Sequence, residues 1–154
     1  MCNRQVWWLQ MKTKPDILRT AMDSLNVAVV VIDDKERIVM FNRTAGQLFG
    51  QDAQDRIDSS ILRCHPERAE PGVLKMIGQM KSGELKKYQG WVNFRGSILY
   101  EYIYPLLDRD GNYMGAVAEL HPAAEKAEYL KSRGEFKEPE LHGVGESSPR
   151  SPHP

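Results

Sequence analysis

The chain has 154 residues, and its 21 lysine and arginine side chains balance 21 aspartate and glutamate side chains, so its formal net charge is zero. A chain of this length is typical of one domain with a substantial hydrophobic core. Proteins that bind nucleic acid or acidic membranes usually carry a basic excess or a basic stripe, and this sequence has neither, so we expect no nucleic acid and no membrane as a partner.

The cysteines and the apolar runs favour a cytoplasmic protein. Cys2 and Cys64 are far apart in the sequence and form neither a disulfide framework nor a C-x-x-C motif. The longest apolar run, residues 27–32, is far shorter than the roughly 18–20 residues that span a bilayer. Residues 1–13 are expected to be an N-terminal extension. Its Trp7 and Trp8 either have no partner in the fold or cover a surface or a dimer contact.

The first half of the chain predicts a helix at residues 14–25, a hairpin with strands at 27–33 and 38–42, and a short helix at 42–50. Pro15 suits the first turn of the first helix, which has apolar residues at helical spacing. The first strand is apolar and β-branched, which is typical of a buried strand. Asn42 and Gly50 are the expected N-cap and C-cap of the short helix.

The second half predicts a longer helix at residues 71–83, three strands at 86–94, 97–107 and 113–120, and a final helix at 122–133. Ile77 lies on the apolar face of the longer helix. The Asp-Gly step at 110–111 supplies the positive φ that a tight turn needs. The sequence after Gly134 is rich in Gly, Pro, Ser and Glu and predicts a disordered tail over residues 134–154.

This order of elements predicts an α+β fold, with an antiparallel sheet whose two parts are joined by helices packed on one face. We therefore expect one domain over residues 14–133, between the extension at 1–13 and the tail at 134–154.

Two segments resemble the PAS domain family, namely "SLNVAVVVIDDKERIVMFNRTAGQLFG" and "YEYIYPLLDRDGNYMGAVAEL". The first resembles the opening hairpin and helix of the family, the second its closing pair of strands, and the resemblance covers about residues 15–131. It implies a five-stranded antiparallel sheet with helices over one face. It also implies a cavity that holds haem, flavin, a chromophore or a metabolite in some members and is filled by side chains in others. The flanking helices of the family commonly form the dimer and carry the signal.

The segment "LRCHPERAEPG" (62–72) bears on the ligand. Its His-Pro-Glu-Arg resembles the segment of carbon-monoxide-responsive PAS regulators in which the His is an axial ligand of haem iron. The resemblance implies His65 as a tentative iron ligand. The second ligand of those regulators is a Met on the next strand, where this chain has Gly90, Trp91 and Val92 instead.

Two alternative roles for His65 stay open. His65-Pro66 suits the entry to a helix, because the residue before a proline is extended, and His65 also suits a polar contact in a small-molecule pocket. His121-Pro122 repeats the step at the expected start of the final helix, where no pocket is predicted, and this weakens the haem hypothesis. Flavin photochemistry is rejected because Cys64 precedes His-Pro and the flavin-binding pattern is missing. Cys64 is expected to be a small buried side chain.

Aromatic side chains on the later strands are further pocket candidates. Trp91, Tyr100 and Tyr102, together with Ile77, are predicted to contact a ligand, although ordinary sheet packing explains an aromatic row as well. Tyr100 and Tyr102 share one face of their strand with Tyr104, and Glu101 lies on the other face. Alternation alone does not fix which face points inward. If the Glu101 face does, Glu101 is a buried carboxylate and a pocket candidate.

Three classes of function follow. The first is a stand-alone PAS sensor that binds a small ligand, or haem through His65, and signals through a homodimer and an unidentified protein partner. The second is a ligand-free PAS dimerisation module. The third is a small enzyme on a similar fold, with Glu101 as its one candidate residue. No phosphate-binding loop or catalytic triad pattern is present, so we expect no enzyme. The dimer is expected to use the helices at 14–25 and 122–133.

Overall fold

The computed structural model describes residues 14–94 and 96–135. The predictions for residues 1–13 and for nearly all of the tail therefore lie outside the described residues. The helices, strands and short 3-10 helices follow one another along the chain as α2 (Pro15–Ser24), β1 (Ala28–Asp33), β2 (Ile38–Phe41), α3 (Arg43–Phe49), α4 (Ala53–Arg56), η1 (Ile61–Cys64), η2 (Glu67–Ala69), α5 (Glu70–Lys81), β3 (Tyr88–Phe94), β4 (Ser97–Leu107), β5 (Tyr113–Pro122) and α6 (Ala124–Ser132).

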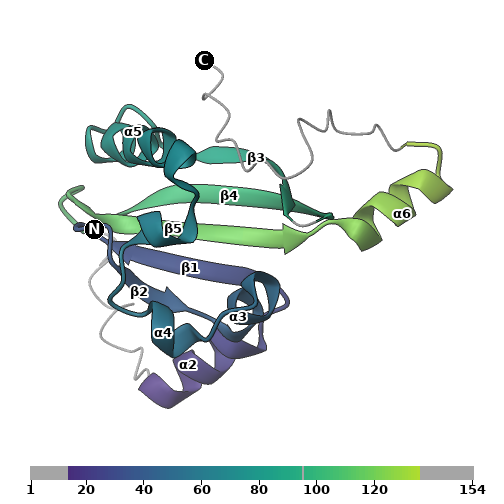
Figure 1. Cartoon of the computed structure of the whole chain (residues 1–154), viewed down its shortest axis with the longest axis horizontal. Helices are drawn as coiled ribbons and strands as arrows, with labels where there is room; N and C mark the ends of the chain where they lie inside the picture. The colour runs from purple at the N-terminus through teal and green to yellow at the C-terminus, as the bar shows by residue number, and fades with distance from the viewer. Residues whose placement is uncertain (1–13, 95, 136–154) are drawn as a thin grey trace, which may run out of the picture.

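The five strands form one sheet in the order β2-β1-β5-β4-β3, and every neighbouring pair is antiparallel. The short helices and α5 lie over one face of this sheet, α2 packs beside α3, and α6 runs off the end of β5 (Figure 1). The predicted α+β fold, a five-stranded antiparallel sheet with helices on one face, is confirmed.

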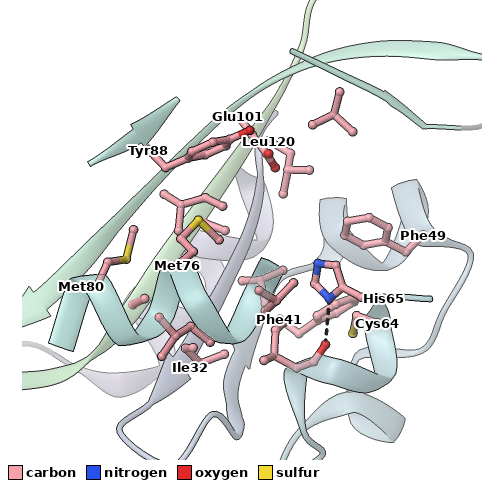
Figure 2. A pocket seen from close by; sticks show the side chains of 18 of the residues that line it. Ile32, Phe41, Phe49, Cys64, His65, Met76, Met80, Tyr88, Glu101 and Leu120 are labelled. Atoms are coloured by element: carbon pink, nitrogen blue, oxygen red, sulfur yellow. Dashed lines mark hydrogen bonds between the residues drawn. The ribbon is translucent and has the colours of Figure 1, made fainter. Parts of the chain in front are cut away.

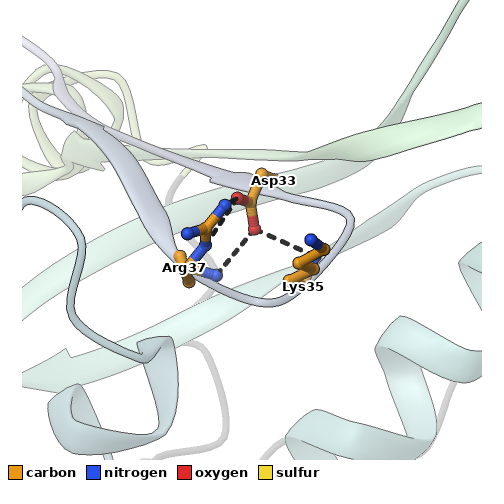
Figure 3. Close-up of polar contacts among 3 residues, drawn as sticks. All are labelled: Asp33, Lys35 and Arg37. Carbon is orange, nitrogen blue, oxygen red and sulfur yellow. Dashed lines mark hydrogen bonds and ion pairs between the residues drawn. The ribbon is translucent and has the colours of Figure 1, made fainter.

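The turn between β1 and β2 is organised by one aspartate (Figure 3). Oδ1 of Asp33 accepts hydrogen bonds from the backbone N–H groups of Lys35 and Arg37, each at 2.9 Å. Its Oδ2 pairs with the Arg37 guanidinium at 2.8 and 2.9 Å. The backbone N–H of Arg37 is the largest of the effects that hold the pKa of this carboxyl below its ordinary value. The aspartate thus serves the turn, as expected from its position between two strands.

The turn between β4 and β5 repeats this design with Asp108. Its Oδ1 accepts from the backbone N–H groups of Asp110 and Asn112, and its Oδ2 accepts from the Asn112 side chain, all at 2.9 Å. Gly111 follows with a φ of 86°, the conformation for which the Asp-Gly step was expected. The same polar turn therefore forms two hairpins, β1-β2 and β4-β5, and the pairing of β1 with β5 joins them into one sheet.

The predicted start of the last helix is wrong. His121 and Pro122 are the last residues of β5, opposite Tyr100 and Leu99 of β4. The helix α6 begins two residues later, at Ala124. The reason is tertiary: β4 is long enough to keep pairing with β5 to its end. A proline is tolerated there because β1 pairs with β5 only as far as Leu120, so beyond that residue β5 is an edge strand on this side.

Asn42 ties the first helix to the sheet. It is 2% exposed, and its Oδ1 accepts hydrogen bonds from the backbone N–H groups of Val29 at 2.9 Å and Ala45 at 3.0 Å. Its Nδ2 donates to the carbonyl oxygens of Met22 and Val27, both at 2.9 Å. The predicted N-cap of α3 thus also anchors β1 and the end of α2, and every hydrogen-bonding direction of its amide is used.

We expect Asn42→Ala to destabilise the fold by about 2–4 kcal/mol, because it leaves buried backbone donors and acceptors without partners. Urea denaturation measures this loss. Asn112→Ala is the matched control: it removes an exposed turn asparagine, and a loss below about 1 kcal/mol is expected. Equal losses in the two variants would contradict the anchoring role of Asn42.

Candidate functional site

A cavity of about 160 Å³ lies between the sheet and the helices that cover it (Figure 2). For comparison, an engineered apolar cavity of about 150 Å³ is large enough to bind benzene. The wall is mostly aliphatic and aromatic. It is formed by Val30, Ile32, Phe41, Phe49, Ile61, Cys64, His65, Val73, Met76, Ile77, Met80, Tyr88, Val92, Phe94, Glu101, Ile103, Ala116, Ala118 and Leu120.

The alternation of β4 settles which side of this strand faces the cavity. Glu101 and Ile103 line the cavity, and Leu99 on the same face is buried in the core at 1% exposure. Glu101 stands opposite Gly90 of β3 and Leu120 of β5. The tyrosines between these positions must point to the opposite face of the sheet.

Glu101 is the one acidic side chain on the cavity wall. In the described part of the chain, no hydrogen bond or ion pair joins its carboxyl to another residue. Removal from bulk water disfavours the charged form and raises the pKa of Glu101 from 4.5 to about 7. The carboxyl therefore changes its charge near neutral pH, and it does so inside an apolar space.

His65 is the second strongly polar group on the wall. Its backbone is extended, with φ −119° and ψ 149°, as expected for a residue that precedes Pro66. Its Nδ1 lies 3.0 Å from the carbonyl oxygen of Ile61, to which it donates a hydrogen bond. In the neutral ring Nε2 therefore carries the lone pair and is a hydrogen-bond acceptor. Figure 2 shows the imidazole directed at the cavity. His65 thus serves both as the entry to η2 and α5 and as part of the cavity wall.

The other predicted contacts divide between the two faces of the sheet. Ile77 of α5 is 5% exposed and lines the cavity. Trp91, Tyr100 and Tyr102 do not line it. They form a row of edge-to-face rings on the outer face, with ring centroids 4.7 and 5.1 Å apart, and His121 continues the row at 5.5 Å. The prediction that these three side chains contact a ligand in the cavity is therefore corrected. They pack against one another on the outer face of the sheet, as the alternative of ordinary sheet packing predicts.

Cys64 also differs from its prediction. It is exposed at the edge of the cavity, because it ends the surface turn η1, and it is not a buried core residue. Partial removal of the Cys64 thiol from water raises its pKa, although the charge of Arg56 acts in the opposite direction. The thiol is therefore not activated as a nucleophile.

Sequence reasoning did not place the four aromatic wall residues, Phe41, Phe49, Tyr88 and Phe94, at the cavity, and it left Glu101 undecided. The alternation of β5 contains the missing signal. Its residues 116, 118 and 120 are all apolar, whereas Glu119 and His121 lie between and beyond them. The apolar positions identify the inner face of β5. Antiparallel pairing with β4 then assigns the face of Glu101, which stands opposite Leu120.

The family follows from a comparison with family models. The model of the PAS domain matches residues 18–121, which is more than half of the chain. The chain belongs to the PAS domain family. No curated protein sequence matches it.

Solved PAS structures share its fold. A PAS domain from Colwellia psychrerythraea has a TM-score of 0.58 and 15% identity, with 70% of this chain and 94% of that chain covered. The PAS domain of Bordetella pertussis BvgS has a TM-score of 0.53 and 20% identity, with 79% and 93% covered. A sensory box sensor histidine kinase from Vibrio cholerae has a TM-score of 0.53 and 17% identity, with 68% and 87% covered.

Haem, the group implied by the segment around His65, does not fit this PAS cavity. The His65 tautomer suits an iron ligand, because Nε2 is the free nitrogen. However, the cavity has a volume suited to a single benzene-sized ring, and a porphyrin contains four pyrrole rings. The strand position of the second ligand has no methionine; Trp91 there points away from the cavity, and Met76 and Met80 belong to α5.

The described residues contain no group of three or more His, Cys, Asp or Glu side chains arranged to hold a metal ion. In the same part of the PAS chain, none of the helices has the length and apolar character needed to cross a bilayer.

The raised pKa of Glu101 predicts a pH-dependent stability. The folded state keeps the proton up to about pH 7, and the unfolded chain loses it near 4.5, so the free energy of unfolding falls as the pH rises through this window. The total loss is on the order of 3 kcal/mol. Glu101→Gln removes it, and we expect the variant to gain stability over the parent between pH 5 and pH 8.

Urea denaturation at both pH values measures the difference. Glu119→Gln is the matched control, because it changes a glutamate on the outer face of the neighbouring strand. A pH dependence that is unchanged in Glu101→Gln would show that Glu101 titrates normally.

Proposed function

We propose that this PAS domain is a sensory module that holds a small ligand in the cavity between its sheet and its helices. The observation that carries the proposal is the cavity itself: an apolar space with two polar groups directed into it, Glu101 and His65. Binding sites for small molecules commonly have this composition, since apolar walls supply affinity and a few polar groups supply orientation. The sensor histidine kinase among the similar structures supports a signalling role.

The ligand-free alternative explains the cavity less well. A PAS module that works by dimerisation alone gains stability from a core filled by apolar side chains. Here a carboxyl with no partner among the described residues faces open space, and an unpaired buried carboxyl costs folding free energy. A bound ligand explains both the unfilled space and the unpaired carboxyl.

The catalytic alternative required a carboxylate or a histidine in an apolar pocket, and both residues are there. Catalysis by such groups usually needs an assembled pair, in which one side chain activates another through a hydrogen bond. Among the described residues no such bond joins Glu101, His65 and Cys64. We therefore infer a binding domain and not an enzyme. The cytoplasmic location stays a prediction.

Filling the cavity tests the proposal. Ala118 lines it between Val30 and Ile103, so Ala118→Phe places a ring in the space of the ligand. We expect mass spectrometry of an organic extract to find a small molecule in the purified parent protein and to find none in Ala118→Phe. Val117→Phe is the matched control, because it adds the same ring on the outer face. An empty extract from the parent protein, expressed in several hosts, would favour the ligand-free module.

The same preparations test haem. Because the cavity does not fit a porphyrin, we expect no Soret band after expression with haem supplied. A Soret band that disappears in His65→Ala and persists in His121→Ala would reverse this conclusion and identify His65 as the iron ligand. A band that persists in both variants would assign the iron to another residue.

We also propose that the module forms a homodimer through α2, and that an unidentified protein partner receives the signal. The described chain buries no residue of α2, and its Ile17 and Leu18 are 63% and 47% exposed. An amphipathic helix with an exposed apolar face is suited to a contact with a second copy. The helix α6 contributes Tyr129, which is 60% exposed.

Light scattering during size exclusion tests the dimer. We expect the parent chain to have the mass of two copies at high micromolar concentration, and Ile17→Glu combined with Leu18→Glu to have the mass of one. Thr20→Glu adds a charge to the polar face of the same helix and should leave the dimer intact. A monomeric parent chain would refute the proposed contact.

A further inference from the structure

The chemistry of the cavity wall restricts what the ligand can be. This inference rests on the proposed function, because it names the ligand class of the same cavity. None of the 19 described side chains on the wall is a lysine or an arginine, so this part of the protein supplies no cation to the Glu101 carboxyl there. Placing a carboxylate in an apolar space without a counter-charge is unfavourable, and a ligand that brings a positive charge removes this penalty.

The second polar group on the wall, His65, favours the same kind of ligand. Because Nδ1 of His65 is used by the carbonyl oxygen of Ile61, the nitrogen left to a ligand in the neutral ring is an acceptor. A carboxylate is an acceptor as well. The two strongly polar groups of the cavity therefore both match a ligand that carries N–H donors.

Aromatic rings also line the cavity. Phe41 and Phe49 lie with ring centroids 6.0 Å apart, and Phe49 and Phe94 lie 5.2 Å apart with their rings nearly perpendicular. Tyr88 lines the cavity beside Glu101 (Figure 2). The faces of aromatic rings attract ammonium groups through their quadrupoles, and this attraction increases in a site removed from water.

We propose that the cavity binds a small hydrophobic amine, whose ammonium group pairs with the Glu101 carboxylate and whose apolar body, about the size of one six-membered ring, fills the rest of the space. The volume of about 160 Å³ sets the size of the body. Binding of this ligand stabilises the charged form of Glu101, so the amine and a proton compete for the carboxylate.

Benzylamine and benzyl alcohol are the probes, since they share a ring and differ in whether the head group is charged. Calorimetric titration of the full chain at pH 8 should show that benzylamine binds at least tenfold more tightly than benzyl alcohol. In Glu101→Gln, which removes the charge at constant shape, benzylamine should lose at least tenfold in affinity and benzyl alcohol should change little. Glu119→Gln, on the outer face, should leave both affinities unchanged.

The pH dependence adds an independent readout. The affinity for benzylamine should fall as the pH drops from 8 to 5, because Glu101 takes up a proton with a pKa of about 7. The other titratable groups that face the cavity are Tyr88 from β3, Cys64 from η1 and His65 after it, whereas α5, β1 and β5 contribute none to the wall. Protonation of His65 acts in the same direction. The carboxyl carbon-13 signal of Glu101 separates the two: its titration midpoint should move to lower pH when benzylamine is present.

The outcomes distinguish this inference from the proposed function. If benzyl alcohol binds and benzylamine does not, or if Glu101→Gln leaves the affinity for benzylamine unchanged, the amine is the wrong ligand class and the cavity still binds small molecules. If neither probe binds and the organic extract of the parent protein is empty, the amine inference and the ligand-binding function both fail.

Discussion

The pairing of β4 with a strand on each side fixes the chemistry of the cavity. Successive side chains of a strand point to opposite faces, so a slip of one residue would put Glu101 outside and the neighbouring tyrosines inside. Such a slip would have to break the ladders with β3 and β5 together, because β4 is hydrogen-bonded to both. The position of the Glu101 carboxyl on the cavity wall is thus secured by the whole central part of the sheet, and the polarity of the cavity follows from it.

The helical wall opposite the sheet is set by polar contacts of the backbone. Asn42 uses its amide to join β1, the end of α2 and the start of α3. His65 closes η1 through Ile61, and Pro66 holds the preceding backbone extended before η2 and α5 begin. The two polar groups of the cavity therefore sit on a frame that the protein's own hydrogen bonds hold in place. Preorganisation of this kind lowers the entropy lost on binding.

Local chemistry predicted the parts of the fold that are decided locally. The aspartate turns and the caps at Asn42 and Gly50 lie where the sequence places them, because each depends on a few neighbouring residues. The two His-Pro steps show the limit of this reasoning: His65-Pro66 precedes a helix, whereas His121-Pro122 stays in a strand because β4 continues beside it. The face of Glu101 was undecidable from β4 alone, since large apolar side chains occur on both sides of that strand. The alternation of β5 carries the decisive information.

The two glutamates at the centre of the sheet show why the cavity points to a ligand. On the outer face, Glu119 accepts a hydrogen bond from the Tyr104 hydroxyl and lies 2.9 Å from Nε2 of His121. Glu101 on the inner face has no such partner among the described residues, although it is the more deeply enclosed carboxyl. An apolar side chain in its place would fill part of the cavity and remove the cost of desolvation, so stability alone does not explain the residue. The sheet thus provides partners for the half-buried Glu119 and, among the described residues, none for Glu101, and the proposed ligand accounts for this difference.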